Sequence, residues 1–68
     1  MDKFYSIVVN DAATGLEEEH TDFLNEEDAR KSFDEFKDSG DYSYAVLREV
    51  TTNWRDYEEV IELDEWTA

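Results

Sequence analysis

Two segments near the start of the chain carry the side chains of β-strands. Residues 3–9 are dominated by aromatic and β-branched residues, and the turn-forming pair Asn10-Asp11 follows them, so they predict a first strand. Gly15 is placed to take the positive φ that a hairpin loop of this length needs. The chain is then expected to return as a second strand over residues 16–23, although three consecutive glutamates make that segment poorer strand material.

The next segment has the spacing of a helix. Asn25 is a suitable N-cap, three acids follow it in the first turn, and Gly40 stands where the helix would end. Phe33 and Phe36 fall on one narrow apolar side. The sequence therefore predicts a helix over residues 26–38 that packs on a sheet through these two phenylalanines.

Two further strands are predicted over residues 42–52 and 57–66, which gives the element order ββαββ. An all-antiparallel sheet with these connections requires the spatial order 2-1-3-4. Independently, strands one and three are the most apolar, as central strands should be, and strands two and four are the most acidic, as border strands should be. We expect residues 1–68 to form a single α+β domain, a four-stranded antiparallel sheet with one helix on one face.

Both faces of this predicted sheet carry apolar residues. In the last strand, for example, Ile61 and Leu63 alternate with Val60 and Trp66. One short helix covers one face, so the other is expected to expose aromatic side chains, as partner-binding surfaces do. The alternative is that long side chains and the chain terminus fold over it. The sequence does not say which face the helix covers.

Charge is the strongest compositional signal. Twenty Asp and Glu stand against six Lys and Arg, for a formal net charge of −14. Ten aromatic residues along the same 68-residue chain favour a folded acidic domain over a disordered acidic tail. The chain has no cysteine, so disulfides and thiolate metal sites are excluded, and stability must come from packing.

Catalysis is not expected. His20 is the single histidine, and nothing places it beside a nucleophile, so we interpret it as a solvated residue and the protein as no enzyme. Asp34, Glu35, Asp38 and Asp41 cluster near a glycine without the spacing of an EF-hand loop. A weak divalent-ion site near Asp38 and Asp41 stays open, but no metal site or cofactor is predicted.

Direct binding to nucleic acid or to a membrane is not expected either. The six basic residues are scattered among more than three times as many acids, so phosphate contacts are disfavoured. No apolar stretch approaches the roughly 18 residues of a membrane span. The first residues lack a secretory pattern, so we expect a cytoplasmic protein, in a host cell if a phage encodes it.

The acids form two groups on the predicted border strands, and such rows of carboxylates can resemble phosphate backbones. A net charge of −14 corresponds to about 24 Å of duplex DNA, close to the expected diameter of so small a domain. The residues predicted to contact a partner are Glu17, Glu18, Glu19 and Asp22 in the first group, and Asp56, Glu58, Glu59, Glu62, Asp64 and Glu65 in the second. Tyr44, Trp54 and Trp66 are predicted to add aromatic contacts.

In size, acidity, aromatic content and lack of cysteine, the whole chain resembles the small acidic inhibitors made by bacteriophages and other mobile elements. These are the anti-CRISPR proteins, the antirestriction proteins and the uracil-DNA glycosylase inhibitors. The resemblance implies a DNA mimic whose carboxylates occupy the basic groove of a CRISPR effector, nuclease or glycosylase and exclude its nucleic acid. The partner would then be a basic nucleic-acid-binding protein.

Two other functions fit the same composition. A homodimeric or adaptor module would bind through an open aromatic sheet face. An ordinary small domain adapted to high salt would carry the acids for solubility. A net charge magnitude of about 2 to 8 is ordinary for a small domain, so −14 favours binding to a cationic partner.

Overall fold

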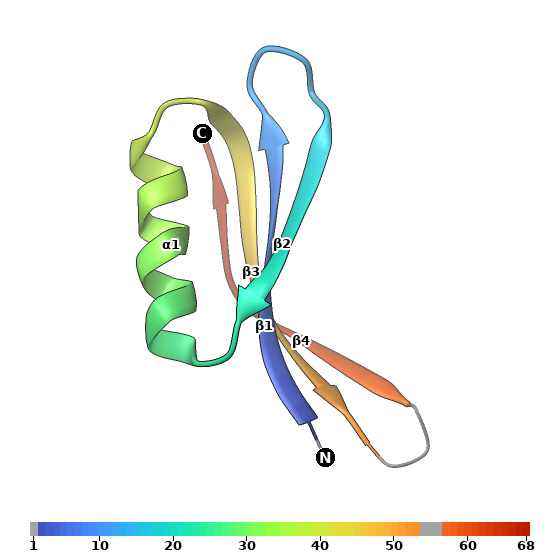
Figure 1. Cartoon of the computed structure of the whole chain (residues 1–68). Helices are drawn as coiled ribbons and strands as arrows, with labels where there is room; N and C mark the ends of the chain where they lie inside the picture. Colours follow the sequence, from blue (N-terminus) through green and yellow to red (C-terminus); the bar gives the residue numbers. More distant parts are fainter. Residues whose placement is uncertain (1, 54–56) are drawn as a thin grey trace.

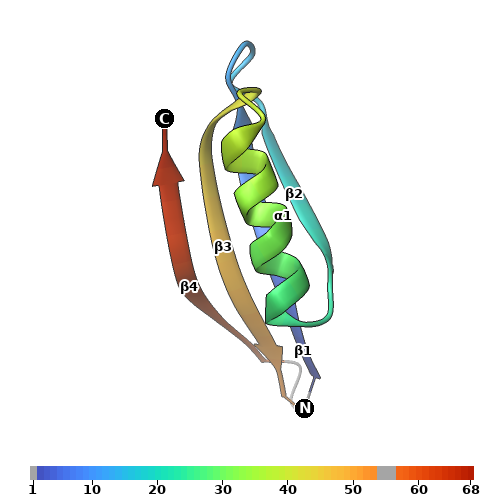
Figure 2. The same ribbon diagram turned by 90° about the vertical axis from the view of Figure 1, so that its left-hand side faces the viewer.

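A computed structural model describes residues 2–53 and 57–68 as a two-layer α+β fold (Figure 1). The four strands form one antiparallel sheet in the order β2-β1-β3-β4, and the helix lies across one face of it (Figure 2). The predicted architecture and strand order are confirmed, and the strand ends differ from prediction by at most two residues. The elements are β1 Asp2–Asp11, β2 Glu17–Phe23, α1 Glu26–Asp38, β3 Tyr42–Thr52 and β4 Glu58–Thr67.

The carboxylate of Asp11 stabilises the turn between β1 and β2. Asp11 accepts hydrogen bonds from the backbone N–H groups of Ala13 at 2.8 Å and Thr14 at 2.9 Å. Gly15 follows with a φ of 75°, which confirms its predicted role, since a side chain would be strained there. The hydrogen bonds from Thr14 and then Ala13 lower the pKa of Asp11, because they stabilise the charged carboxylate.

Replacing this carboxylate with an amide is expected to destabilise the protein in a pH-dependent way. Because folding lowers the pKa of Asp11, its charge stabilises the folded state at pH values above the ordinary pKa of 3.8, and this stabilisation is lost as pH falls through the lowered value. Asp11→Asn should therefore melt a few degrees below the wild type at pH 7, and the gap should close in strong acid. Thermal unfolding followed by circular dichroism gives the two melting temperatures at each pH. If the difference between them is the same in strong acid as at pH 7, the proposed role of the Asp11 charge is contradicted.

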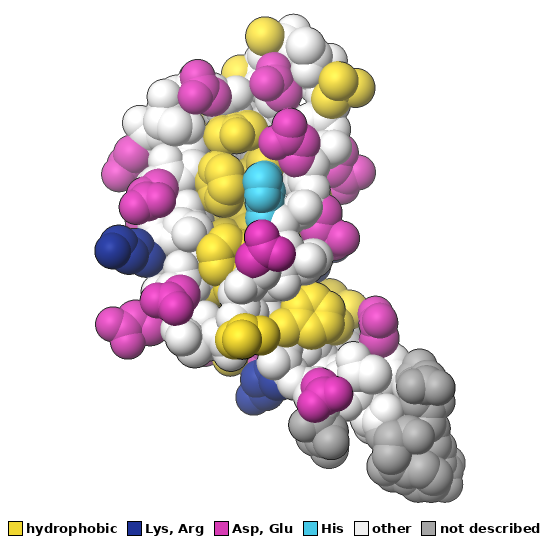
Figure 3. Space-filling model, in the orientation of Figure 1, with side chains coloured by type: hydrophobic (Ala, Val, Ile, Leu, Met, Phe, Trp, Pro, Cys, Tyr) yellow, Lys and Arg dark blue, Asp and Glu magenta, His cyan; other side chains and the backbone are white. Residues whose placement is uncertain are grey.

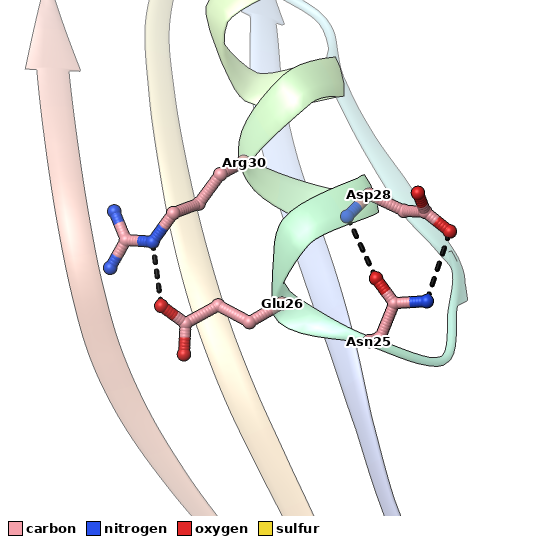
Figure 4. A network of polar contacts seen from close by, with 4 residues as sticks. All are labelled: Asn25, Glu26, Asp28 and Arg30. Atoms are coloured by element: carbon pink, nitrogen blue, oxygen red, sulfur yellow. Dashed lines mark hydrogen bonds and ion pairs between the residues drawn. The ribbon is translucent and has the colours of Figure 1, made fainter.

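The helix begins and ends with the predicted caps. The Asn25 side chain accepts a hydrogen bond from the Asp28 backbone N–H at 2.8 Å and donates one to the Asp28 carboxylate at 3.0 Å. One turn along, Glu26 and Arg30 form an ion pair of 2.7 Å (Figure 4). At the other end Gly40 has a φ of 77°. The Asn25 side chain thus satisfies the backbone N–H of Asp28, a donor that the first turn would otherwise leave unpaired.

The hydrophobic core lies between the helix and the two central strands. Phe33 is its largest fully buried side chain at 2% exposed. Phe36 is half-buried and lies against the rings of His20 and Tyr42, with centroids 5.0 and 5.2 Å away. The predicted packing through both phenylalanines is confirmed. The buried core residues are Tyr5, Ile7, Val9, Ala29, Phe33, Ala45 and Leu47.

The sheet is longer than the helix that covers it. The start of β1 and the hairpin end of β3 and β4 project beyond α1 (Figure 1), and the Cα trace extends over 40 × 22 × 16 Å. β4 is a border strand, and within the described chain its outer edge pairs with no other strand. Eight of its ten residues are exposed, among them Val60 and Ile61. The border strands are therefore the most accessible part of the sheet.

Candidate protein-binding surface

The sheet face away from the helix, called the open face below, has no element of the described chain packed on it (Figure 2). Strand side chains alternate between faces, and Ile7, Val9 and Leu47 belong to the helix-side core. Val8 and Val46, which pair with each other, therefore lie on the open face. Each residue paired directly with one of them across the sheet shares that face.

The middle of the open face is apolar, but it is not the exposed aromatic surface that the sequence predicts. Val8, Val46 and Val50 are all buried, while Phe4 and Tyr44 are half-buried. Val8 and Val46 are each paired with a longer glutamate of a border strand, Glu19 and Glu65, and these side chains limit solvent access to the two valines. The expectation of broadly exposed aromatics was wrong, and the alternative of cover by long side chains describes this face better.

Two rows of exposed glutamates border the open face. Glu17 and Glu19, the β2 row, pair with Asn10 and Val8 of β1. Glu58, Glu62 and Glu65, the β4 row, pair with Thr52, Arg48 and Val46 of β3. Three strand spacings separate β2 from β4, which places the rows about 14 Å apart. The strand order therefore produces two rows of carboxylates on the border strands, as the sequence suggested.

The floor between the rows carries little compensating charge. Arg48, the one base on the open face of the described chain, lies 3.9 Å from the Glu62 carboxylate, and the Ser6 hydroxyl donates to Glu19 at 3.4 Å. Burial raises the pKa of Tyr44, and the nearby carboxylates of Glu65 and Glu62 raise it further. The open face is therefore a negative surface around a small apolar centre.

The helix side has many acids too, but bases accompany them. Arg30 pairs with Glu26 at 2.7 Å and Lys37 with Asp34 at 3.0 Å. The pKa of Lys37 is raised, chiefly by its hydrogen bond to Asp34 and further by the charge of Asp64. These pairs offset only part of the charge on that side, so the acids of the described chain are spread over both faces.

The remaining predicted contact residues lie elsewhere. Glu18 and Asp64 pair with Val9 and Leu47 of the core, so they lie on the helix side, as does Glu59 one position from Glu58. Asp22 lies in the irregular stretch of β2 where the register shifts. Trp66 pairs with Ala45 and packs against the helix-side core, so we exclude it from the open face. Trp54 and Asp56 lie outside the described residues.

A shallow groove of about 200 Å³ runs across the open face between the border strands. Of its lining residues, the sequence predicted only Glu19 and Glu58 as partner contacts. The alternation of side chains along a strand is enough to place Phe4 and Ser6 on the same face as Val8. Which residues of the other strands lie beside them depends on the strand register, which the sequence does not give. The lining residues are Phe4, Ser6, Glu19, Thr21, Arg48, Val50, Glu58 and Val60.

His20 is only partly solvated, with 38% of its side chain exposed. Its ring lies against Phe36, and its Nε2 atom is shielded from solvent 3.7 Å from the Glu18 carboxylate. Figure 3 views this side of the molecule, where the histidine touches hydrophobic side chains between α1 and β2. The position of its ring makes His20 a packing residue beside the core. In the described chain, no group of three or more histidine or acidic side chains converges as a metal site would require.

No protein family model matches this chain, and no curated protein or solved structure shows significant similarity to it. Among the described residues, no helix is long and apolar enough to cross a membrane.

Proposed function

We propose that the protein is an acidic inhibitor that mimics DNA. It binds, through its open face, the basic nucleic-acid site of a DNA-processing or host defence protein, such as a nuclease or CRISPR effector, and excludes the nucleic acid. The observation that carries this proposal is the pair of glutamate rows on the two border strands. Their separation of about 14 Å is comparable to the DNA major groove, which is about 12 Å wide.

The charge density supports an approximate mimic of duplex DNA. A net charge of −14 over a long dimension of 40 Å is one charge per about 2.9 Å, against about 1.7 Å for the duplex. The chain is more elongated than the sequence estimate assumed, so its density is lower than duplex-like. It still exceeds what solubility requires of a small domain.

The apolar floor adds what charge alone does not supply. Interfaces derive most of their affinity from a few desolvated contacts surrounded by polar groups. The half-buried rings of Phe4 and Tyr44 lie on the open face between the border strands, in the place where such contacts are needed. Long-range charge would speed the encounter, and this floor would hold the complex.

The test compares two variants that remove equal charge from different faces. The immobilised protein is incubated with host lysate, and captured proteins are quantified with and without excess duplex DNA. We expect nucleic-acid-binding proteins that DNA displaces. The open-face variant Glu17→Gln, Glu19→Gln, Glu62→Gln should lose them, whereas the helix variant Glu27→Gln, Glu35→Gln, Asp38→Asn should retain them.

Equal losses in both variants, or capture that duplex DNA does not displace, would contradict the proposal. A homodimer remains the main alternative in which the chain binds a second copy of itself. Dimerisation through the open face would bring glutamate rows of two copies together, which disfavours it. A stable dimer in sedimentation equilibrium that the open-face variant dissociates would favour this alternative.

A further inference from the structure

The groove on the open face has the size of a single side chain. Pockets for cofactors and drug-sized molecules hold about 300–1,000 Å³, whereas this one holds about 200 Å³. It is also shallow, between residues of all four strands. A small molecule would find little enclosure there, but a side chain projecting from a bound protein would fit.

The charges around the groove select a cation. Glu19 lines it from β2 and Glu58 lines it from β4. Arg48 also lines the groove, but its guanidinium lies 3.9 Å from Glu62 on the neighbouring strand. Glu19 and Glu58 therefore remain as acceptors for an incoming positive group.

The apolar residues of the groove favour a cation that carries a hydrophobic stem. Phe4, Val50 and Val60 line the same groove, and Val60 is 51% exposed. A long basic side chain lays its methylene stem on such a surface while its charged end reaches the carboxylates. Arginine fits better than lysine, because its planar guanidinium forms two hydrogen bonds with one carboxylate and stacks on an aromatic ring such as Phe4.

We propose that this groove binds an arginine side chain of the protein partner, with the stem against Phe4, Val50 and Val60 and the guanidinium bonded to Glu58, while Glu19 adds negative charge from the other border strand. That the arginine belongs to a nucleic-acid-binding site rests on the proposed function. The groove itself is tested without any partner protein. An arginine that would otherwise contact a DNA phosphate is the natural anchor for a DNA mimic.

The experiment titrates the isotope-labelled protein with N-acetyl-arginine amide, N-acetyl-lysine amide and glycine amide, and follows backbone amide shifts by NMR. We expect saturable shifts at groove residues such as Thr21 and Val50, with arginine binding at least about threefold more tightly than lysine. The variant Glu19→Gln, Glu58→Gln should weaken arginine binding about fivefold. The matched control Glu18→Gln, Glu59→Gln removes the same charge from neighbouring positions on the other face and should leave binding within about 1.5-fold.

Equal weakening in the two variants, or equal affinity for arginine and glycine amide, would overturn the groove assignment. Both variants carry the same net charge, and their amide spectra report directly whether each is folded. The capture experiment with excess duplex DNA is independent of the NMR titration. If capture depends on the open face but arginine amide does not bind the groove, the arginine proposal fails while the inhibitor proposal stands.

Discussion

Phe33→Ala is expected to leave most of the protein unfolded at 37 °C. Phe33 is 2% exposed and is the largest fully buried side chain of the described core. Removing such a phenylalanine typically costs about 3–5 kcal/mol, because the cavity collapses only in part. A domain of this length has a total stability of roughly 3–10 kcal/mol, and its chain has no cysteine to form a disulfide.

The matched control is Phe36→Ala on the same helix. Phe36 is only half-buried, so its loss should lower the melting temperature by a smaller amount, at about 4–8 °C for each kcal/mol. Thermal and urea unfolding followed by circular dichroism compare the two. If both variants melted at the same temperature, Phe33 would not be the central packing residue that its burial indicates.

Raising sodium chloride from 50 to 500 mM is expected to weaken binding to the captured partner by about a hundredfold or more. Attraction between a chain of net charge −14 and a cationic site depends on charges that salt screens within a few Å at high ionic strength. Electrostatic steering alone accelerates association by roughly 10²- to 10³-fold at low salt. The affinity is measured by fluorescence titration at each salt concentration.

The same salt series separates the inhibitor from a domain adapted to high salt. Screening reduces repulsion among the acids, so the melting temperature of the isolated chain should rise with salt, while the chain should already be folded at 50 mM. A chain that is unfolded at 50 mM and regains structure at high salt would support the salt-adapted alternative. Partner affinity that does not depend on salt would remove the electrostatic basis of the proposal.

The sequence predicted the fold well because its local signals were unambiguous. Asn25 and Gly40 mark the ends of the helix. The Asn25 side chain accepts a hydrogen bond from the first turn, and Gly40 adopts the positive φ that follows the last turn. The strand order found is the one expected from connectivity. Charge agreed with it, because the two most acidic strands lie at the borders.

The composition of the candidate site was harder to predict, because it depends on irregularities in the sheet. The register between β3 and β4 shifts where Leu47 pairs with Asp64 and Arg48 pairs with Glu62. The extra residue, Leu63, reverses the alternation, so Asp64 lies on the helix side and Glu65 joins the open face. Nothing in the local sequence indicates this bulge, and a one-residue shift moves every later side chain to the other face.

The charge on the unpaired outer edge of β4 opposes assembly of this molecule with itself. A second copy joining edge to edge would align two strands rich in glutamate and aspartate, and their mutual repulsion opposes fibril-like stacking. That protection depends on ionised carboxylates. Near the isoelectric point of about 4.1 it fades, and the exposed Val60 and Ile61 then become sites for aggregation.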